Sequence, residues 1–433
     1  MNLKKNPYVL EIPVDRGFRL LVNPLKYAAR TVVNLQQFAM WQALVDKPLD
    51  EAAEISQMPP KSAQKLADKL LQLGMLSVDE QRSAFVRGDP QYLDVWVHTT
   101  NSCTLDCTYC YIKKSPEHMS LAVMEKMAEE LIATAVKHRL KSIKLRLAGG
   151  EPLMRFAIWK SFLLELKTEL DKHHCRLQIC FVSNLTIISD EIIEFIKQYK
   201  CHLSVSLDGL ADCHDLTRIY PGGAGSFARV TKNMDMLIEA RIKPYVLIVV
   251  SEANVAGLPD LTQYLLDKNL GFRYSLIKGE ALDHDRLRVS LAECYRLIEI
   301  AIIKKYYRFT DRHGLCDISF EGSAVKPCAS GRSSCLVDIN GDLHLCAYAR
   351  SQEKPIGHLS NSEDLLEVIG RQTQFPQLAS TAECESCPYR RICASGCPLD
   401  RVKGQSPYCD IFKQFIPEVY RLIGKEELYK HIK

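Results

Sequence analysis

The sequence predicts an α/β fold: an open, partial (β/α)6 barrel with a smaller module before it and a cysteine-rich domain after it. Apolar strand-like runs alternate with helical periodicity across the middle of the 433-residue chain. The stretch before this alternation has short strands followed by helices, and the stretch after it carries closely spaced cysteines. We therefore expect three domains, over residues 1–88, 89–310 and 311–433.

The first domain combines two short strand-like runs, FRLLVNP and RTVVNL, with three helical stretches. We expect helices over 35–45, over 49–55 after Pro48, and over 62–73 before a stop at Gly74. This order resembles a winged-helix module, especially the peptide-recognition domains of enzymes that mature ribosomally made peptides. The resemblance implies that a leader peptide adds a strand to an exposed sheet edge. Two alternatives are a structural cap and a DNA-binding winged helix, although the third helix has no arginine to contact guanine.

The middle domain repeats a strand followed by a helix, which indicates parallel βαβ units. A strand LDVWVHTT comes first, and counting it gives six units, which fits an open barrel better than a closed eight-fold one. The later strands are expected over 142–148, 176–183, 202–208, 244–250 and 272–276. The intervening helices are expected over 121–137, 157–170, 190–197, 227–240 and 258–267.

Bulk composition limits the class of protein. Hydrophobic residues make up 47% of the chain, so its core does not need disulfide bonds. The N-terminal sequence has no continuous apolar segment of a signal peptide, and runs such as PYVLIVV are too short to span a bilayer. We expect a cytoplasmic protein whose 17 cysteines include metal ligands. The net charge of +4 gives no reason to expect nucleic acid or a membrane as a partner.

A loop after the first barrel strand carries three cysteines, Cys103, Cys107 and Cys110. Three thiolates can hold three irons of a 4Fe-4S cube, and the fourth iron stays open for chemistry. Zinc is the alternative, but it favours four ligands and paired C-x-x-C spacing. The spacing, with aromatic Tyr109 before the last cysteine, resembles the signature of the radical S-adenosylmethionine (SAM) enzymes. The resemblance implies that the open iron binds the methionine part of SAM.

The ends of later strands carry further candidates for SAM binding. The second strand ends in Gly149, Gly150 and Glu151, which resembles the family element that binds the SAM amino group. An ordinary tight turn is the alternative. The third ends in Ser183 and Asn184, where relatives usually have Thr-Asn-Gly, and here Leu185 replaces the glycine.

The fourth strand, SVSLDG, matches the family's SIDG-like strand and provides Ser206 and Asp208. The resemblance implies that Ser206 contacts the ribose or carboxylate of SAM. His214-Asp215-x-x-Arg218 and then Gly225-Ser226-Phe227 follow, an order typical of the branch that modifies peptides and proteins. We include Arg218 among the cofactor-binding candidates. The alternative is that Asp215 and Arg218 form a solvated turn pair of little energetic weight.

Seven cysteines near the C-terminus match the SPASM extension of this family, which implies two auxiliary 4Fe-4S clusters. The resemblance gives the outer cluster Cys384, Cys387, Cys393 and Cys409, and the inner cluster Cys328, Cys346 and Cys397. Cys316 is our first candidate for the fourth inner ligand, and Cys335 is expected to be a buried thiol. A zinc-ribbon-like structural site is the alternative. We expect Cys175, Cys180, Cys201, Cys213 and Cys294 to be core or surface thiols.

Together these features predict a radical SAM enzyme with three 4Fe-4S clusters that oxidatively modifies a leader-bearing precursor peptide. The resemblance implies a 5'-deoxyadenosyl radical, a carbon–carbon or thioether crosslink, and a reducing partner such as flavodoxin or ferredoxin. The first alternative is an anaerobic sulfatase-maturating enzyme, which forms formylglycine, but that type has Asp after the cysteine matching Cys346 and this chain has Ala347. The second is an iron–sulfur DNA-binding sensor. No catalytic acid or base is identified from the sequence.

Overall fold

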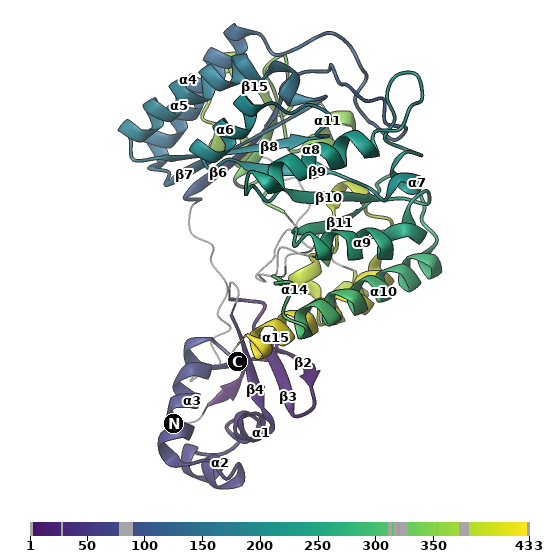
Figure 1. Ribbon diagram of the computed structural model, residues 1–433. Helices are drawn as coiled ribbons and strands as arrows, with labels where there is room; N and C mark the ends of the chain where they lie inside the picture. Colours follow the sequence, from purple (N-terminus) through teal and green to yellow (C-terminus); the bar gives the residue numbers. More distant parts are fainter. Residues whose placement is uncertain are drawn as a thin grey trace. The chain divides into compact units, whose positions relative to one another are not determined.

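The computed structural model describes residues 3–26, 29–77, 90–310, 314–315, 318, 320, 328–352, 354–371 and 381–430. The chain forms two compact units, drawn in Figure 1. We call them the barrel unit, made of Gly88–Leu282 and Ala329–Pro376, and the terminal unit, made of Met1–Arg87, Asp283–Cys328 and Gln377–Lys433.

The barrel unit is built on six parallel strands in the order β11-β10-β9-β8-β7-β6. Their bounds are β6 Tyr92–His98, β7 Ser142–Ala148, β8 Arg176–Ser183, β9 His202–Ser206, β10 Tyr245–Val250 and β11 Phe272–Leu276. The strands predicted over 142–148, 176–183 and 272–276 have these bounds, while β9 ends two residues before the predicted end at Asp208.

Helices between the strands complete the barrel. They are α4 Leu121–His138, α5 Phe156–Lys172, α6 Asp190–Gln198, α7 Ala211–His214, α8 Phe227–Glu239 and α9 Leu258–Asp267. Strand β7 shows how the sequence sets the layers, since Ile143, Leu145 and Leu147 are fully buried in alternation with polar residues. On the alternate positions Arg146 forms a bidentate ion pair with Asp94 of β6, at 2.7 Å for both bonds. The apolar residues on these strands therefore make the core, and the alternate face carries paired charges.

A hairpin from the C-terminal third extends the same sheet. Strand β13 (Ser334–Val337) runs parallel to β6, and β14 (Asp342–His344) and β15 (Gly357–His358) follow in antiparallel order. Cys335 lies on β13 beside Val95 and is 1% exposed, in line with the expected buried thiol. Two short helices, α11 (Ala347–Gln352) and α12 (Leu365–Gly370), complete the unit.

The terminal unit begins with an antiparallel sheet in the order β2-β3-β4. Its strands are β2 Leu10–Asp15, β3 Phe18–Val22 and β4 Arg30–Asn34, with β1 Lys4–Lys5 pairing β5 Leu76–Ser77. The helices α1 Leu35–Ala43, α2 Leu49–Ile55 and α3 Pro60–Gln72 follow, close to the predicted ranges. Trp41, Met40 and Leu44 form the fully buried centre of this module. Strand β2 was not predicted, because Pro13 interrupts its apolar alternation.

Helix α15 (Cys409–Tyr429) joins the ends of the chain within the terminal unit, packing on the β2-β3-β4 sheet and on α10 (His284–Ile303), as Figure 1 shows. Gly424 allows the close contact with the sheet, since a Cβ there would lie 2.5 Å from Cγ2 of Val14. On the other side Arg421 donates to Glu299 of α10 at 2.7 and 2.8 Å. The remaining elements are β12 Gly314–Leu315, α13 Ala382–Ser386 and α14 Arg390–Cys393.

Candidate iron–sulfur and cofactor site

Cys103, Cys107 and Cys110 lie half-buried on the loop that leaves β6, as the barrel rule requires. Two polar side chains approach the thiols: the amide of Asn184 donates to Sγ of Cys103 at 3.4 Å, and Nζ of Lys114 donates to Sγ of Cys110 at 3.3 Å. Backbone bonds from Asp106 to Ile219, at 2.7 Å, and from Thr108 to Thr217, at 3.0 Å, hold the loop in place.

The chemistry of this donor set suits an iron–sulfur cluster. Burial raises the pKa of the Cys107 thiol to about 11 and raises that of Cys103, so a metal must displace the protons when it binds. The positive charges of Lys114 and Arg218 lower the pKa of Cys103 and Cys107 respectively and so favour the thiolates.

Gly149 and Gly150 pack against the cysteine loop itself. The backbone N–H of Gly150 donates to Thr100 O at 2.7 Å, and that of Glu151 donates to Ser102 O at 2.9 Å. A Cβ on Gly150 would lie 1.9 Å from Ser102 O, and Gly149 has a φ of +119°. The glycines therefore permit the approach of two backbone segments, and a contact with the SAM amino group stays a prediction.

The Glu151 carboxylate connects the second and third strand ends. It is fully buried and accepts from Ser183 Oγ at 2.9 Å, Asn184 N at 2.8 Å and Leu153 N at 3.0 Å. Burial raises the pKa of Glu151 to about 7, against the opposing effect of these hydrogen bonds. Glu151 therefore holds the backbone of Asn184, whose side-chain amide donates to Cys103.

Leu185 departs from the family pattern but keeps the backbone conformation that a glycine favours. Its φ is +56°, in the left-handed region, and its side chain is fully buried. The side-chain amide of Asn233 donates to the carbonyl of Leu185 at 2.9 Å, and the backbone N–H of Leu185 donates to Ser183 Oγ at 2.8 Å. The substitution therefore leaves the path of the Ser183-Asn184 turn intact.

Arg218, Asp208 and Tyr109 form a buried group behind the cysteine loop. Arg218 Nε donates to Asp208 Oδ2 at 2.6 Å, the Tyr109 hydroxyl donates to the same oxygen, and Val249 N donates to Oδ1 at 2.9 Å. Arg218 is 7% exposed, so the alternative of a solvated Asp215–Arg218 pair is wrong. Ser206 ends β9 half-buried.

Hydrogen bonds join the His214-Asp215-x-x-Arg218 motif to the Gly225-Ser226-Phe227 motif. Buried His214 contacts Ser226 Oγ through Nε2 at 3.0 Å, and Asp215 accepts from Phe227 N at 2.8 Å. The N–H of Asp208 donates to His214 Nδ1 at 3.3 Å. These motifs therefore fix the loop that carries Arg218 rather than presenting free polar groups.

In the terminal unit, Cys384, Cys387, Cys393 and Cys409 line one pocket, together with Tyr389 and Lys413 among others. These are the four cysteines expected for the outer cluster. Burial raises the pKa of Cys393 to about 12 and raises that of Cys409, which Lys413 opposes. A lining with four thiols, which a metal would deprotonate on binding, fits a cubane.

The expected inner ligands belong to different parts of the chain. Cys346 precedes α11 in the barrel unit, while Cys397 follows α14 in the terminal unit and Cys328 is exposed. Cys316 lies outside the described residues. The inner cluster and its fourth ligand stay predictions.

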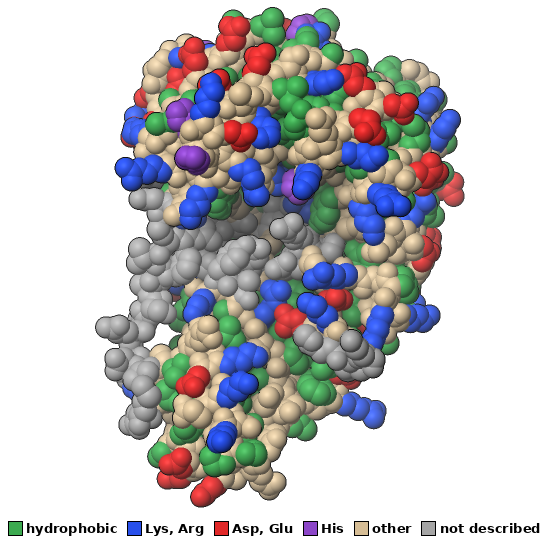
Figure 2. Space-filling model, turned by 60° about the vertical axis from the view of Figure 1, so that its left-hand side comes forward, with side chains coloured by type: hydrophobic (Ala, Val, Ile, Leu, Met, Phe, Trp, Pro, Cys, Tyr) green, Lys and Arg blue, Asp and Glu red, His purple; other side chains and the backbone are tan. Residues whose placement is uncertain are grey.

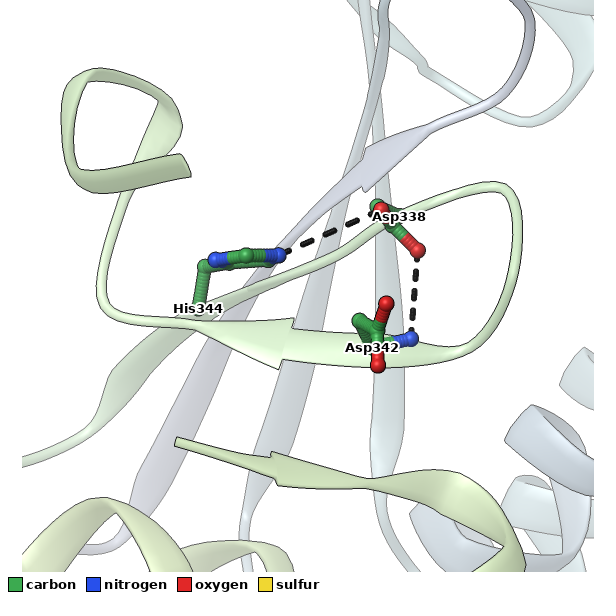
Figure 3. A group of neighbouring side chains, drawn as sticks. All are labelled: Asp338, Asp342 and His344. Carbon is green, nitrogen blue, oxygen red and sulfur yellow. Dashed lines mark hydrogen bonds and ion pairs between the residues drawn. The ribbon is translucent and has the colours of Figure 1, made fainter. Parts of the chain in front are cut away.

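Asp338, in the turn after β13, forms a group with Asp342 and His344 of β14 that the sequence analysis missed (Figure 3). His344 Nε2 lies 3.9 Å from Asp338 Oδ2. Arg350 Nε lies 3.6 Å from that oxygen, and the other oxygen accepts from the backbone of Asn340 and Asp342. Because the guanidinium already neutralises Asp338, we assign this group to the turn and a buried ion pair rather than to a cation.

The chain is similar to known proteins. Residues 97–263 match the model of the Radical SAM superfamily, and the chain belongs to that superfamily. It is a radical SAM enzyme. Among curated relatives, the cysteine-type anaerobic sulfatase-maturating enzyme of Clostridium perfringens is 20% identical over 359 residues, covering 75% of this chain and 95% of that one. The mycofactocin maturase MftC of Mycobacterium ulcerans is 26% identical over 337 residues, covering 72% and 85%.

Solved structures show the same fold. The native anSMEcpe with bound AdoMet and Cp18Cys peptide has a TM-score of 0.64 at 18% identity, and covers 79% of this chain and all of that one. SuiB of Streptococcus suis bound to the precursor peptide SuiA has a TM-score of 0.52 at 14% identity, and covers 94% of this chain and 98% of that one.

The face drawn in Figure 2 carries charges of both signs. In the view of Figure 2, Lys and Arg side chains are intermixed with Asp and Glu, and no area of a single sign covers this face. Among the described residues, no helix has the length and apolar character needed to cross a membrane.

Proposed function

We propose that this radical SAM enzyme oxidatively modifies a ribosomally made peptide and forms a carbon–carbon or thioether crosslink. The observation that carries the proposal is the N-terminal module, in which the β2-β3-β4 sheet precedes three helices and, among the described residues, its outer strand β4 pairs with β3 alone. The structural match to SuiB, which binds the precursor peptide SuiA, covers 94% of this chain, whereas the match to anSMEcpe covers 79%. Because the match to SuiB covers more of the chain, it supports a shared fold that includes the N-terminal sheet and its three helices.

Strand β4 is the edge best suited to accept a leader peptide. Both β2 and β4 are outer strands of the sheet. Strand β2 contains Pro13, which lacks an N–H, and its register shifts between Pro13 and Asp15; proline and irregular register both block the pairing of edges. Strand β4, Arg30–Asn34, is regular and rich in β-branched residues, and in the described part of the chain it pairs only with β3. A leader strand would therefore pair with β4.

Cys103, Cys107 and Cys110 would hold the SAM-binding cluster, and the cysteines that match the SPASM extension would hold two auxiliary clusters. When bound, these groups supply one-electron reduction of SAM and removal of a hydrogen atom from an unactivated carbon. The chain's own contribution is position and exclusion of water. The buried Arg218–Asp208 pair and the Glu151–Asn184 contact fix the cysteine loop, and Lys114 offsets its negative charge.

The test uses the intact chain, reconstituted anaerobically with iron and sulfide and supplied with SAM, a reductant and a small peptide encoded beside its gene. Mass spectrometry should show a product lighter by two hydrogen atoms for each crosslink. Hydrogen exchange with the leader part alone should slow in β4 and not in β2. A peptide that is bound but never changed in mass contradicts the proposal, and so does equal turnover of a peptide without its leader.

Formation of formylglycine is the second candidate, because sulfatase-maturating enzymes are among the relatives. Ala347 follows Cys346, where that type has Asp, which counts against it. The same assay decides the question with a peptide that contains a sulfatase-type cysteine. Conversion of that cysteine to an aldehyde would favour the second candidate.

A further inference from the structure

Arg401 organises the short segment that separates two of the expected cluster ligands, Cys393 and Cys397. Its guanidinium donates to three consecutive backbone carbonyls: from Nη2 to Ala394 at 2.9 Å and to Gly396 at 3.3 Å, and from Nε to Ser395 at 3.1 Å. One side chain therefore holds every residue between the two cysteines.

These three residues adopt a conformation that the chain does not favour. Their φ angles are +49° for Ala394, +64° for Ser395 and +75° for Gly396, all in the left-handed region. The left-handed conformation costs about 1–2 kcal/mol for each residue that has a Cβ. Gly396 cannot be replaced easily, because a Cβ there would lie 2.6 Å from Cβ of Ser406. The segment keeps this shape only if other contacts determine it, and Arg401 supplies them.

The same guanidinium lies in the electrostatic field of the cysteines. Burial lowers the pKa of Arg401, while the thiols of Cys397, Cys384 and Cys393, once ionised, act in the opposite direction. A thiolate-bound cluster carries negative charge, and a nearby cation that already bonds the backbone suits that environment. The positive charge and the backbone contacts thus belong to one side chain.

We propose that Arg401 is a positioning residue for the auxiliary clusters: it fixes the left-handed Ala394-Ser395-Gly396 segment so that Cys393 and Cys397 face two different clusters. The inference rests on the proposed function, in which these cysteines ligate the outer and the inner cluster respectively. Three intervening residues allow many relative directions of the two thiolates, and the three hydrogen bonds from Arg401 select one of them. Without Arg401, the segment relaxes and at least one ligand turns away from its iron.

The test measures auxiliary iron directly, in full-length protein whose Cys103, Cys107 and Cys110 are all replaced by Ala. This background should retain about eight irons. Adding Arg401→Gln should remove about half of them or more, whereas Lys403→Gln, an exposed change in the same loop, should remove none. Arg401→Lys keeps the charge, but its three donors lie on one nitrogen and cannot reproduce the contacts that Nε and Nη2 of the planar guanidinium make. It should retain more iron than Arg401→Gln, with an altered magnetic interaction between the reduced clusters in electron paramagnetic resonance.

A rescue experiment separates positioning from charge or misfolding. Ser395→Gly lowers the cost of the left-handed backbone, so it should restore part of the iron to the Arg401→Gln protein. Full iron and an unchanged spectrum in Arg401→Gln would overturn the inference and leave the proposed function standing. The inference would also be overturned if Ser395→Gly fails to restore iron and Arg401→Lys behaves like the wild type. The positive charge of residue 401, and not its hydrogen bonds, would then account for the iron content. A background protein with no iron would instead overturn the auxiliary clusters themselves.

Discussion

The Arg218 guanidinium lies 2.6 Å from the Asp208 carboxylate, and their side chains are only 9% and 1% exposed. A buried carboxylate of this kind is tolerated because its charge is paired and its oxygens accept hydrogen bonds. The pair joins the end of β9 to the loop that supports Thr108 of the cysteine loop. The geometry of the cofactor site therefore depends on residues that do not carry a thiol.

Arg218→Leu is expected to destabilise the protein by about 3–5 kcal/mol, because Asp208 is left buried without its partner. Adding Asp208→Asn removes the unpaired charge and should recover part of this loss. Thermal unfolding under anaerobic conditions measures both effects. Arg176→Leu, at an exposed position at the start of β8, is the matched control and should change stability by about 0.5 kcal/mol or less. Equal effects of Arg218→Leu and Arg176→Leu would contradict the role of the pair.

Replacing Cys103, Cys107 and Cys110 together by Ala should lower the iron content from about twelve to about eight per chain and abolish cleavage of SAM. Iron analysis and the release of methionine measure the two outcomes. Cys201→Ala, a half-buried thiol without ligand spacing, should leave both unchanged. A protein that contains chiefly zinc and lacks visible charge-transfer absorption would rule out the clusters.

Gly150→Ala should impair the same cluster without removing a ligand. The added methyl group would lie 1.9 Å from Ser102 O, so the cysteine loop must move. We expect a loss of about four irons and of SAM cleavage, with the auxiliary iron retained. Gly370→Ala adds a methyl group where no atom lies within 4 Å and is the control. Unchanged iron in Gly150→Ala would show that the loop has room to adjust.

The stability of the terminal unit should depend on pH through Glu299. Hydrogen bonds from Arg421, and secondarily from Lys425, lower the pKa of Glu299 from 4.5 to about 2. The unfolded chain therefore binds the proton first as the pH falls, and the stabilisation present above pH 4.5 is lost as the pH approaches 2. Glu299→Gln should flatten the pH dependence of the unfolding temperature in this window. The control Glu125→Gln, at an exposed position, should leave the pH dependence of the unfolding temperature unchanged.

Gly424→Leu tests the contact between α15 and the N-terminal sheet. Removing a helical glycine favours the helix by up to about 1 kcal/mol, but overpacking against Val14 costs about 1–3 kcal/mol, so a net loss of stability is expected. Val14→Ala in the same chain should reduce that loss. Thermal unfolding of the two single variants and the double variant measures the coupling. Additive effects would show that the two residues do not restrict each other.

The sequence predicted the elements of the barrel well because their signals are local. The alternation in Ser142–Ala148 and the apolar periodicity of Leu258–Asp267 depend only on neighbouring residues. The cysteine spacing is a local signal of the same kind, and the clusters that it indicates stay a prediction. Contacts between distant residues have no such signal: the pairing of Arg30 with Glu427, 397 positions apart, could not be anticipated from either segment. The glycines at 149 and 150 were expected to approach a ligand, whereas the structure shows them against the backbone of the cysteine loop.

The position of α15 has a consequence for synthesis of the chain. Strand β2 is made early, but Asp15 bonds Tyr429, 414 residues later, at 2.9 Å. Ribosomes add on the order of 5–20 residues per second, so the apolar face of β2 and β3 that α15 covers waits on the order of tens of seconds for its partner. During that interval Val14 and Leu20 are available to chaperones or to other nascent chains. Truncated translation products that lack α15 are therefore expected to aggregate through this sheet.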